Sequence, residues 1–76
     1  MSKPESIVAA LGGHQNITDV HACITRLRVT VADLDGVSED ALKEAGAFGV
    51  VVHGHVVQVV VGPEADDLAG AIARLP

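Results

Sequence analysis

Residues 26–31 read Arg-Leu-Arg-Val-Thr-Val and alternate polar and apolar side chains without interruption. Because successive side chains of a strand point to opposite faces, this alternation predicts a β-strand with one apolar and one polar face. Leu27, Val29 and Val31 are expected to point inward, and the polar side chains between them outward. The other segments are assigned around this strand.

Two hairpins supply the predicted sheet. Residues 17–31 are rich in β-branched side chains, which predicts a strand, a turn and the strand just described. Residues 50–61 form a valine-rich run whose turn is expected at His53-Gly54-His55. One face of its second strand consists of Val57, Val59 and Val61.

Glycine and proline mark the ends of the first and last helices. Pro4 suits an early helical position, and Gly12-Gly13 ends the first helix, since glycine adopts the left-handed conformation at little steric cost. Gly62 and Pro63 are expected to open the last helix. Its apolar stripe at i, i+4 and i+7 consists of Leu68, Ile72 and Leu75.

A further helix is predicted between the hairpins. Ser38 is the expected N-cap, and acidic residues follow it in the first turn. Val37 and Leu42 occupy the two positions of a hydrophobic staple, and Gly46 stops the helix. The order is therefore helix, hairpin, helix, hairpin, helix. It predicts one α+β domain over residues 1–76, with a four-stranded, mainly antiparallel sheet and three helices packed on one face.

Composition excludes several classes of function. The 76 residues carry a net charge of −5, whereas a nucleic-acid module needs clustered Lys and Arg. No apolar run approaches the ~20 residues of a membrane helix, so no membrane insertion is expected. The single cysteine, Cys23, excludes an internal disulfide framework and a Cys-pair zinc site, and it suits a reducing cytoplasm.

Cys23 is the residue most able to carry chemistry, and two readings of it are open. A free cysteine is most often a small buried side chain. Here, however, Arg26 and Arg28 have the same parity on the predicted strand, and Thr25 adds a hydroxyl. Two guanidinium forks and a hydroxyl suit a tetrahedral anion. A nucleophile beside such a receptor indicates phosphoryl transfer through a covalent intermediate.

Competing chemistries have weaker support. His21 could act as the base of a cysteine hydrolase, although strand neighbours two apart need not touch. A tyrosine-phosphatase loop needs five residues between cysteine and arginine, whereas two separate Cys23 from Arg26. His53 and His55 flank a turn glycine with no recognisable ligand spacing, so neither a metal nor another cofactor is expected.

The segment Cys-Ile-Thr-Arg-Leu-Arg at residues 23–28 closely resembles the glucose family of enzyme IIB domains of the bacterial phosphoenolpyruvate-dependent sugar phosphotransferase system. The resemblance spans nearly the whole chain. Its other matching positions are Leu11-Gly12-Gly13, Asn16-Ile17, Asp33, Leu42, Gly46-Ala47, Gly49-Val50, Gln58-Val59-Val60 and Gly62-Pro63.

The resemblance implies a sugar-specific phosphotransferase. Cys23 would accept a phosphoryl group from a phosphohistidine of enzyme IIA and pass it to a sugar held by the membrane enzyme IIC. Arg26, Arg28 and Thr25 would orient and partly neutralise that group, and backbone N–H groups of Cys23, Ile24 and Thr25 would add donors. Glucose or N-acetylglucosamine is the implied sugar class, and the location is cytoplasmic, peripheral to enzyme IIC.

Three points stay open. The chain could be a free-standing subunit or a fragment of a longer one. The same fold could also serve as a regulatory binding module that reports the phosphorylation state of a transporter. The family pattern assigns no role to His21, although a nearby imidazolium would favour a thiolate at Cys23.

Overall fold

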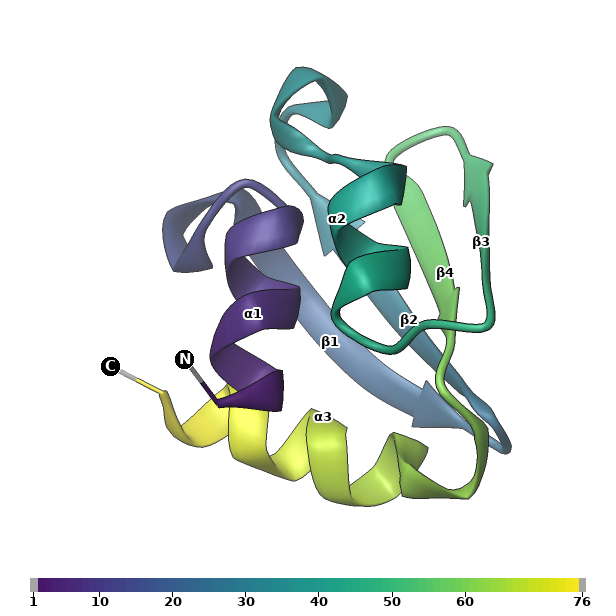
Figure 1. The fold of residues 1–76 in the computed structure, drawn as a ribbon. Coiled ribbons are helices and arrows are strands. Elements are labelled where there is room, and N and C mark those ends of the chain that lie inside the picture. Colours follow the sequence, from purple (N-terminus) through teal and green to yellow (C-terminus); the bar gives the residue numbers. More distant parts are fainter. Residues whose placement is uncertain (1, 76) are drawn as a thin grey trace.

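The computed structural model describes residues 2–75 and contains a four-stranded sheet and three α-helices (Figure 1). The sheet order is β1-β2-β4-β3, and every neighbouring pair is antiparallel. The predicted α+β class and element order are confirmed. The strands are β1 (Ile17–Cys23), β2 (Arg26–Val31), β3 (Gly49–His53) and β4 (Val56–Val60). The helices are α1 (Lys3–Ala10), α2 (Glu39–Glu44) and α3 (Ala65–Arg74).

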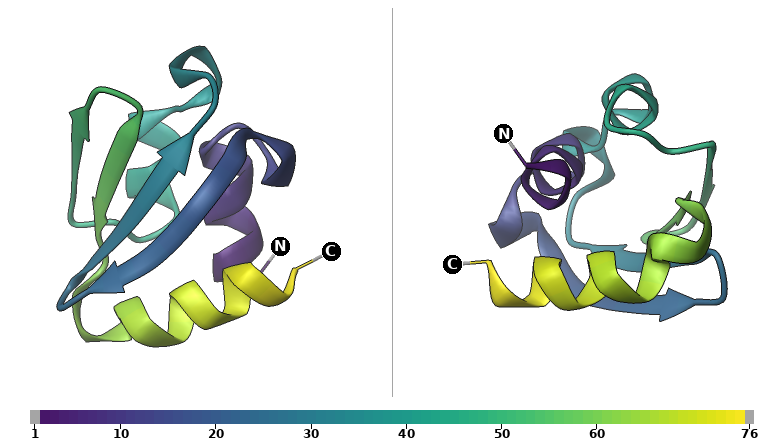
Figure 2. Two further views of the ribbon diagram at one scale, coloured as in Figure 1. Left: turned by 180° about the vertical axis from the view of Figure 1, so that it is seen from behind. Right: turned by 60° about the horizontal axis from the view of Figure 1, so that its bottom comes forward.

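The helices form a layer on one face of the sheet, as predicted. Seen from behind in Figure 2, the strands lie in front of α1 and α2, while α3 runs beside β1 at the lower edge. Helix α3 contacts β1 and β2, and α1 contacts both other helices. The opposite face of the sheet is therefore open to a partner.

The core lies between these two layers. Leu27, Val29 and Val31 of β2 are buried, as are Val57, Val59 and Val61 in and just after β4. Both predicted inward faces are thus confirmed. Among residues 2–75 no polar or charged residue is buried, so burial of apolar side chains is what holds the layers together. The helices contribute mainly Ile7, Val8, Ala10, Leu42, Ala65, Leu68 and Ile72.

Side-chain caps fix the starts of two helices. The Ser38 hydroxyl accepts a hydrogen bond from the backbone N–H of Ala41 at 3.2 Å, which confirms the predicted N-cap of α2. Helix α1 begins with a capping box in which Glu5 accepts from both the hydroxyl and the backbone N–H of Ser2. The Ser2 hydroxyl bond holds the pKa of the Glu5 carboxyl below its usual value.

Two ends differ in detail from the prediction. A short 3-10 turn (Gly62–Glu64) precedes α3, and Pro63 lies in it. Leu75 lies one residue beyond α3, although it still packs against the core. The helix ends before Leu75 because the backbone of Leu75 is extended. The predicted apolar stripe therefore continues one residue beyond the helix.

Asn16 connects the end of the first helical segment to the end of the first hairpin. Its side-chain amide donates to the carbonyls of Leu11 at 2.7 Å and Asp33 at 2.8 Å. Its side-chain oxygen accepts from the backbone N–H of Asp33 at 2.9 Å. One half-buried side chain therefore satisfies three backbone groups that regular secondary structure leaves free.

We expect Asn16→Ala to lower the free energy of unfolding by about 2 kcal/mol, because it leaves these backbone groups without their partners. Urea denaturation monitored by circular dichroism measures the change. Gln15→Ala, at an exposed neighbouring position, is the control and should stay within about 0.5 kcal/mol of the unchanged protein. Equal effects of the two substitutions would contradict the connecting role of Asn16.

Candidate functional site

Cys23 is the last residue of β1, and its side chain is exposed. It lies directly opposite Arg26, the first residue of β2, in the antiparallel register. Of the two readings left open by the sequence, the buried one is therefore wrong. The thiol stands at the tip of a hairpin, where another protein can reach it.

The two-residue turn between β1 and β2 has an unusual backbone. Ile24 has φ 58°, a left-handed conformation that is a genuine outlier for a β-branched residue. Its side chain is 88% exposed, so no packing of that side chain accounts for the conformation. Strain of this kind persists only where surrounding structure imposes it, and it concentrates at functional sites.

The neighbouring residue of the turn is tied to the end of β4. The carbonyl oxygen of Thr25 accepts hydrogen bonds from the backbone N–H groups of Val61 at 3.0 Å and Gly62 at 2.9 Å. These two bonds fix the turn, and hence Cys23, to the chain that directly follows β4. These bonds use the carbonyl of Thr25 and not its hydroxyl. The contact of the hydroxyl with a phosphoryl group stays a prediction.

Arg26 and Arg28 project from the open face of the sheet on which Cys23 lies. Arg26 pairs with Cys23, and Arg28 pairs with His21 on β1. Both arginines are exposed. Within residues 2–75 neither forms an ion pair with a carboxylate, so both retain their charge for an external anion. The predicted common orientation of the two arginines is confirmed.

Gln58 of β4 is a member of this cluster to which the sequence assigned no role. Its side-chain oxygen accepts a hydrogen bond from Nη1 of Arg26 at 2.9 Å, and its backbone pairs with Arg28. The signal available in the sequence was one polar residue in a run of valines, at an outward position. The amide holds one guanidinium fork in place without neutralising it.

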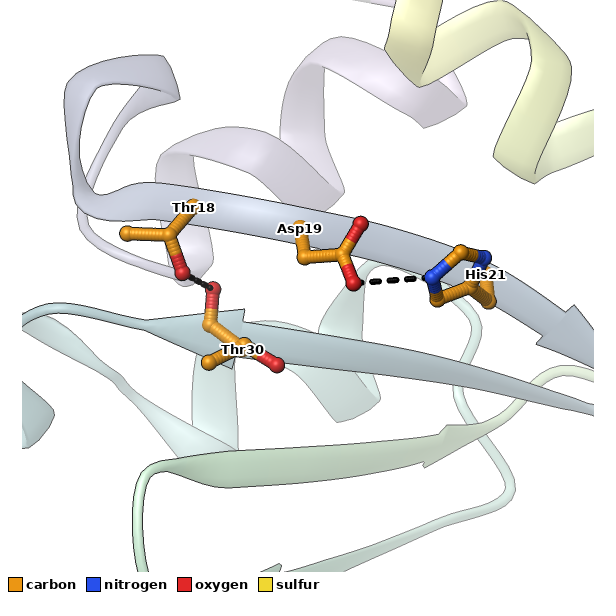
Figure 3. A network of polar contacts seen from close by, with 4 residues as sticks. All are labelled: Thr18, Asp19, His21 and Thr30. Atoms are coloured by element: carbon orange, nitrogen blue, oxygen red, sulfur yellow. Dashed lines mark hydrogen bonds and ion pairs between the residues drawn. The ribbon is translucent and has the colours of Figure 1, made fainter.

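Two histidine side chains, His21 and His55, make polar contacts at different places in the sheet. His21 lies on the open face of β1, where its Nε2 is 2.8 Å from a carboxylate oxygen of Asp19 (Figure 3). One residue before Asp19, the Thr18 hydroxyl donates to the carbonyl of Thr30 on β2 (Figure 3). His55 belongs to the far turn, and its Nδ1 donates to the carbonyl of Val31.

Metal-ligating side chains are scattered in the part of the chain that the structure describes. Residues 2–75 contain no group of three or more His, Cys, Asp or Glu side chains arranged to hold an ion. The same residues form no helix with the length and apolar character needed to cross a bilayer.

Comparison with known proteins gives consistent results. The family model described as the phosphotransferase system EIIB matches residues 5–37. The N-acetylglucosamine-specific EIIB component of Streptomyces coelicolor is 55% identical over 71 residues, which cover 93% of this chain and 92% of that protein.

Two longer relatives match over almost the same residues. The glucose-specific EIICBA component of Streptococcus pneumoniae is 49% identical over 93% of this chain. The N-acetylglucosamine-specific EIICBA component of Escherichia coli is 42% identical over 90% of it. This chain spans only 10% and 11% of their respective lengths.

A solved structure shares the fold. A crystal structure of one domain of the phosphotransferase IIabc component from Clostridium difficile superposes with a TM-score of 0.73. The match covers 93% of this chain and 79% of that one at 24% identity, so it supports the architecture alone.

We expect Ile24→Gly to raise the free energy of unfolding by about 1 kcal/mol, because glycine adopts a positive φ without steric cost. Thermal and urea denaturation measure the change. Thr25→Gly is the matched control at the next position. Its φ is not positive, so that substitution should destabilise. A loss of stability in Ile24→Gly would show that the turn is not strained at Ile24.

Proposed function

Because this chain belongs to the EIIB family of the phosphotransferase system, glucose type, we propose that it is a sugar-specific phosphotransferase subunit that carries the phosphoryl group on Cys23. The single observation that carries this assignment is the exposed thiol at a hairpin tip, facing Arg26 across the turn. Exposure lets the thiol meet a donor and then an acceptor, and the adjacent positive charge suits the group transferred.

The proposed donor is a phosphohistidine of enzyme IIA. The cysteine sulfur attacks phosphorus, the S–P bond forms and the N–P bond breaks, and the histidine leaves with a proton in place of the phosphoryl group. The transferred group carries charge on its oxygens throughout, so positioning and electrostatic stabilisation supply the catalysis. Arg26 and Arg28 provide that charge, and backbone N–H groups of Ile24 and Thr25 provide further donors.

The proposed acceptor is a sugar hydroxyl bound by the membrane enzyme IIC. The hydroxyl oxygen attacks phosphorus, the S–P bond breaks and the thiol is restored. Two relatives are named EIICBA components, so their names join C and A parts to the B part. This supports enzyme IIA and enzyme IIC as the partners. Glucose or N-acetylglucosamine is the proposed sugar class, because the relatives named above are specific for one or the other.

The surroundings of the thiol suit docking to protein partners. Ile24 is 88% exposed beside Cys23, and Phe48 is 77% exposed. The Phe48 ring lies close to Gly62, whose N–H binds the Thr25 carbonyl, so both apolar side chains belong to the same end of the sheet. Aromatic and arginine side chains are enriched at protein interfaces, and both lie at this end of the sheet. We propose a cytoplasmic location, with peripheral association to enzyme IIC.

The test is intact-protein mass spectrometry after incubation with phosphoenolpyruvate, the general phosphotransferase proteins and a cognate enzyme IIA. We expect one added phosphoryl group, mapped to Cys23 under conditions that preserve thiophosphate. Cys23→Ser should fold normally, because the side chain is exposed, and should gain no stable thiophosphate. No gain by the unchanged protein, with a reduced thiol and an active enzyme IIA, would reject the carrier function and favour a regulatory binding module.

A second prediction concerns the guanidinium fork of Arg26. Arg26→Lys keeps the charge but loses bidentate geometry and the bond to Gln58, so we expect sugar phosphorylation to fall by about tenfold or more. Reconstituted sugar phosphorylation with enzyme IIC measures the loss. Arg74→Lys, on an exposed position of α3, is the matched control and should retain full activity. Full activity of Arg26→Lys would show that charge alone suffices.

A further inference from the structure

Asp19, His21 and Cys23 occupy alternate positions of β1 and therefore share one face of the strand. Alternate residues of a strand are roughly 6.7 Å apart at their Cα atoms, and in the structure the imidazole at the middle position contacts Asp19 and not Cys23. All three lie on the edge strand, on the open face of the sheet. The strand thus lines up a carboxylate, an imidazole and the reactive thiol.

The contact between Asp19 and His21 is present in the structure. Nε2 of His21 lies 2.8 Å from Oδ2 of Asp19, and the second ring nitrogen lies on the side of the ring away from that carboxylate (Figure 3). A carboxylate accepts, so Nε2 carries the hydrogen. In the neutral imidazole the other nitrogen, Nδ1, is then a free proton acceptor.

We propose that His21, oriented by Asp19, accepts the proton of the Cys23 thiol during phosphoryl transfer. This inference rests on the proposed function. As the S–P bond forms and the N–P bond of the donor breaks, the thiol proton moves from Sγ to Nδ1 of His21. The donor histidine takes its own proton from solvent, and the sugar hydroxyl returns one proton to solvent in the second transfer. Asp19 acts as a positioning residue, and its carboxylate stabilises the imidazolium that forms.

The charges around His21 favour proton uptake at that moment. Arg28 lies directly across from His21 on β2, and Arg26 lies across from Cys23. The carboxylate of Asp19 faces the ring from β1. Helix α3 packs against the other face of β1, so its charged residues do not face the ring. When the phosphoryl group arrives, its negative charge offsets the arginines and favours the charged imidazole.

The same proton is returned in the second transfer. When a sugar hydroxyl attacks phosphorus, the S–P bond breaks and the sulfur leaves as a thiolate. The imidazolium of His21 gives its proton back to Sγ, which restores the neutral pair, and the hydroxyl proton leaves to solvent. His21 ends each cycle unchanged.

The experiment compares the unchanged protein with His21→Gln, which keeps a polar side chain but cannot accept the proton. The first readout is the rate of alkylation of Cys23 by iodoacetamide, followed by intact mass across about pH 5 to 9. It requires no partner. We expect the rate at neutral pH to fall by about tenfold and the pH profile to move toward alkaline pH. This effect is smaller than that of an enclosed acid–base group, because water screens an exposed pair.

The second readout is the single-turnover rate of phosphorylation by enzyme IIA, which should fall by a similar factor. Asp19→Asn, which retains a hydrogen-bond acceptor without charge, should cause a smaller change of the same sign in both readouts. His53→Gln, on the opposite edge strand, is the matched control and should change neither. Circular dichroism verifies that each variant folds.

Unchanged rates and an unchanged pH profile in His21→Gln would overturn the proposal. An equal loss at every pH would also overturn it, because that result indicates a structural role. The two hypotheses fail separately: an unchanged protein that gains no phosphoryl group rejects the carrier function, while the alkylation profile still decides whether His21 and Cys23 exchange a proton.

Discussion

The register of β2 between β1 and β4 is the constraint on which the rest of the structure depends. It places Leu27, Val29 and Val31 against the helices and, by the period of two, places Arg26 and Arg28 on the open face. A slip of one residue would bury both guanidinium groups and expose the core. Because burying an unpaired charge is costly, the apolar core and the functional face specify the same register.

The turn that presents Cys23 is held by the sheet and not by its own side chains. The Thr25 carbonyl accepts hydrogen bonds from two backbone N–H groups directly after β4. Ile24 has a strained, left-handed backbone while its side chain is exposed to solvent. The core therefore supplies the free energy that keeps the thiol at the tip of the hairpin. This arrangement gives a small chain a rigid reactive group without an enclosed cavity.

The charges on the open face of the sheet suit a carrier of phosphoryl groups. A net charge of −5 coexists with two arginines beside the thiol that form no ion pair among residues 2–75, so two of the five basic residues lie where a phosphoryl group would reside. Gln58 orients one guanidinium without neutralising it. A carboxylate in its place would occupy the fork that the anion needs.

Local periodicity and turn chemistry predict the element order, the inward faces of β2 and β4, the N-cap at Ser38 and the shared parity of Arg26 and Arg28 near Cys23. The folded structure was needed to establish that Cys23 is exposed, that Ile24 is strained, and that Gln58 and the Asp19–His21 pair belong to the same face. These features depend on which strands pair and in what register. That choice is made by packing between residues far apart in the chain, which no local pattern records.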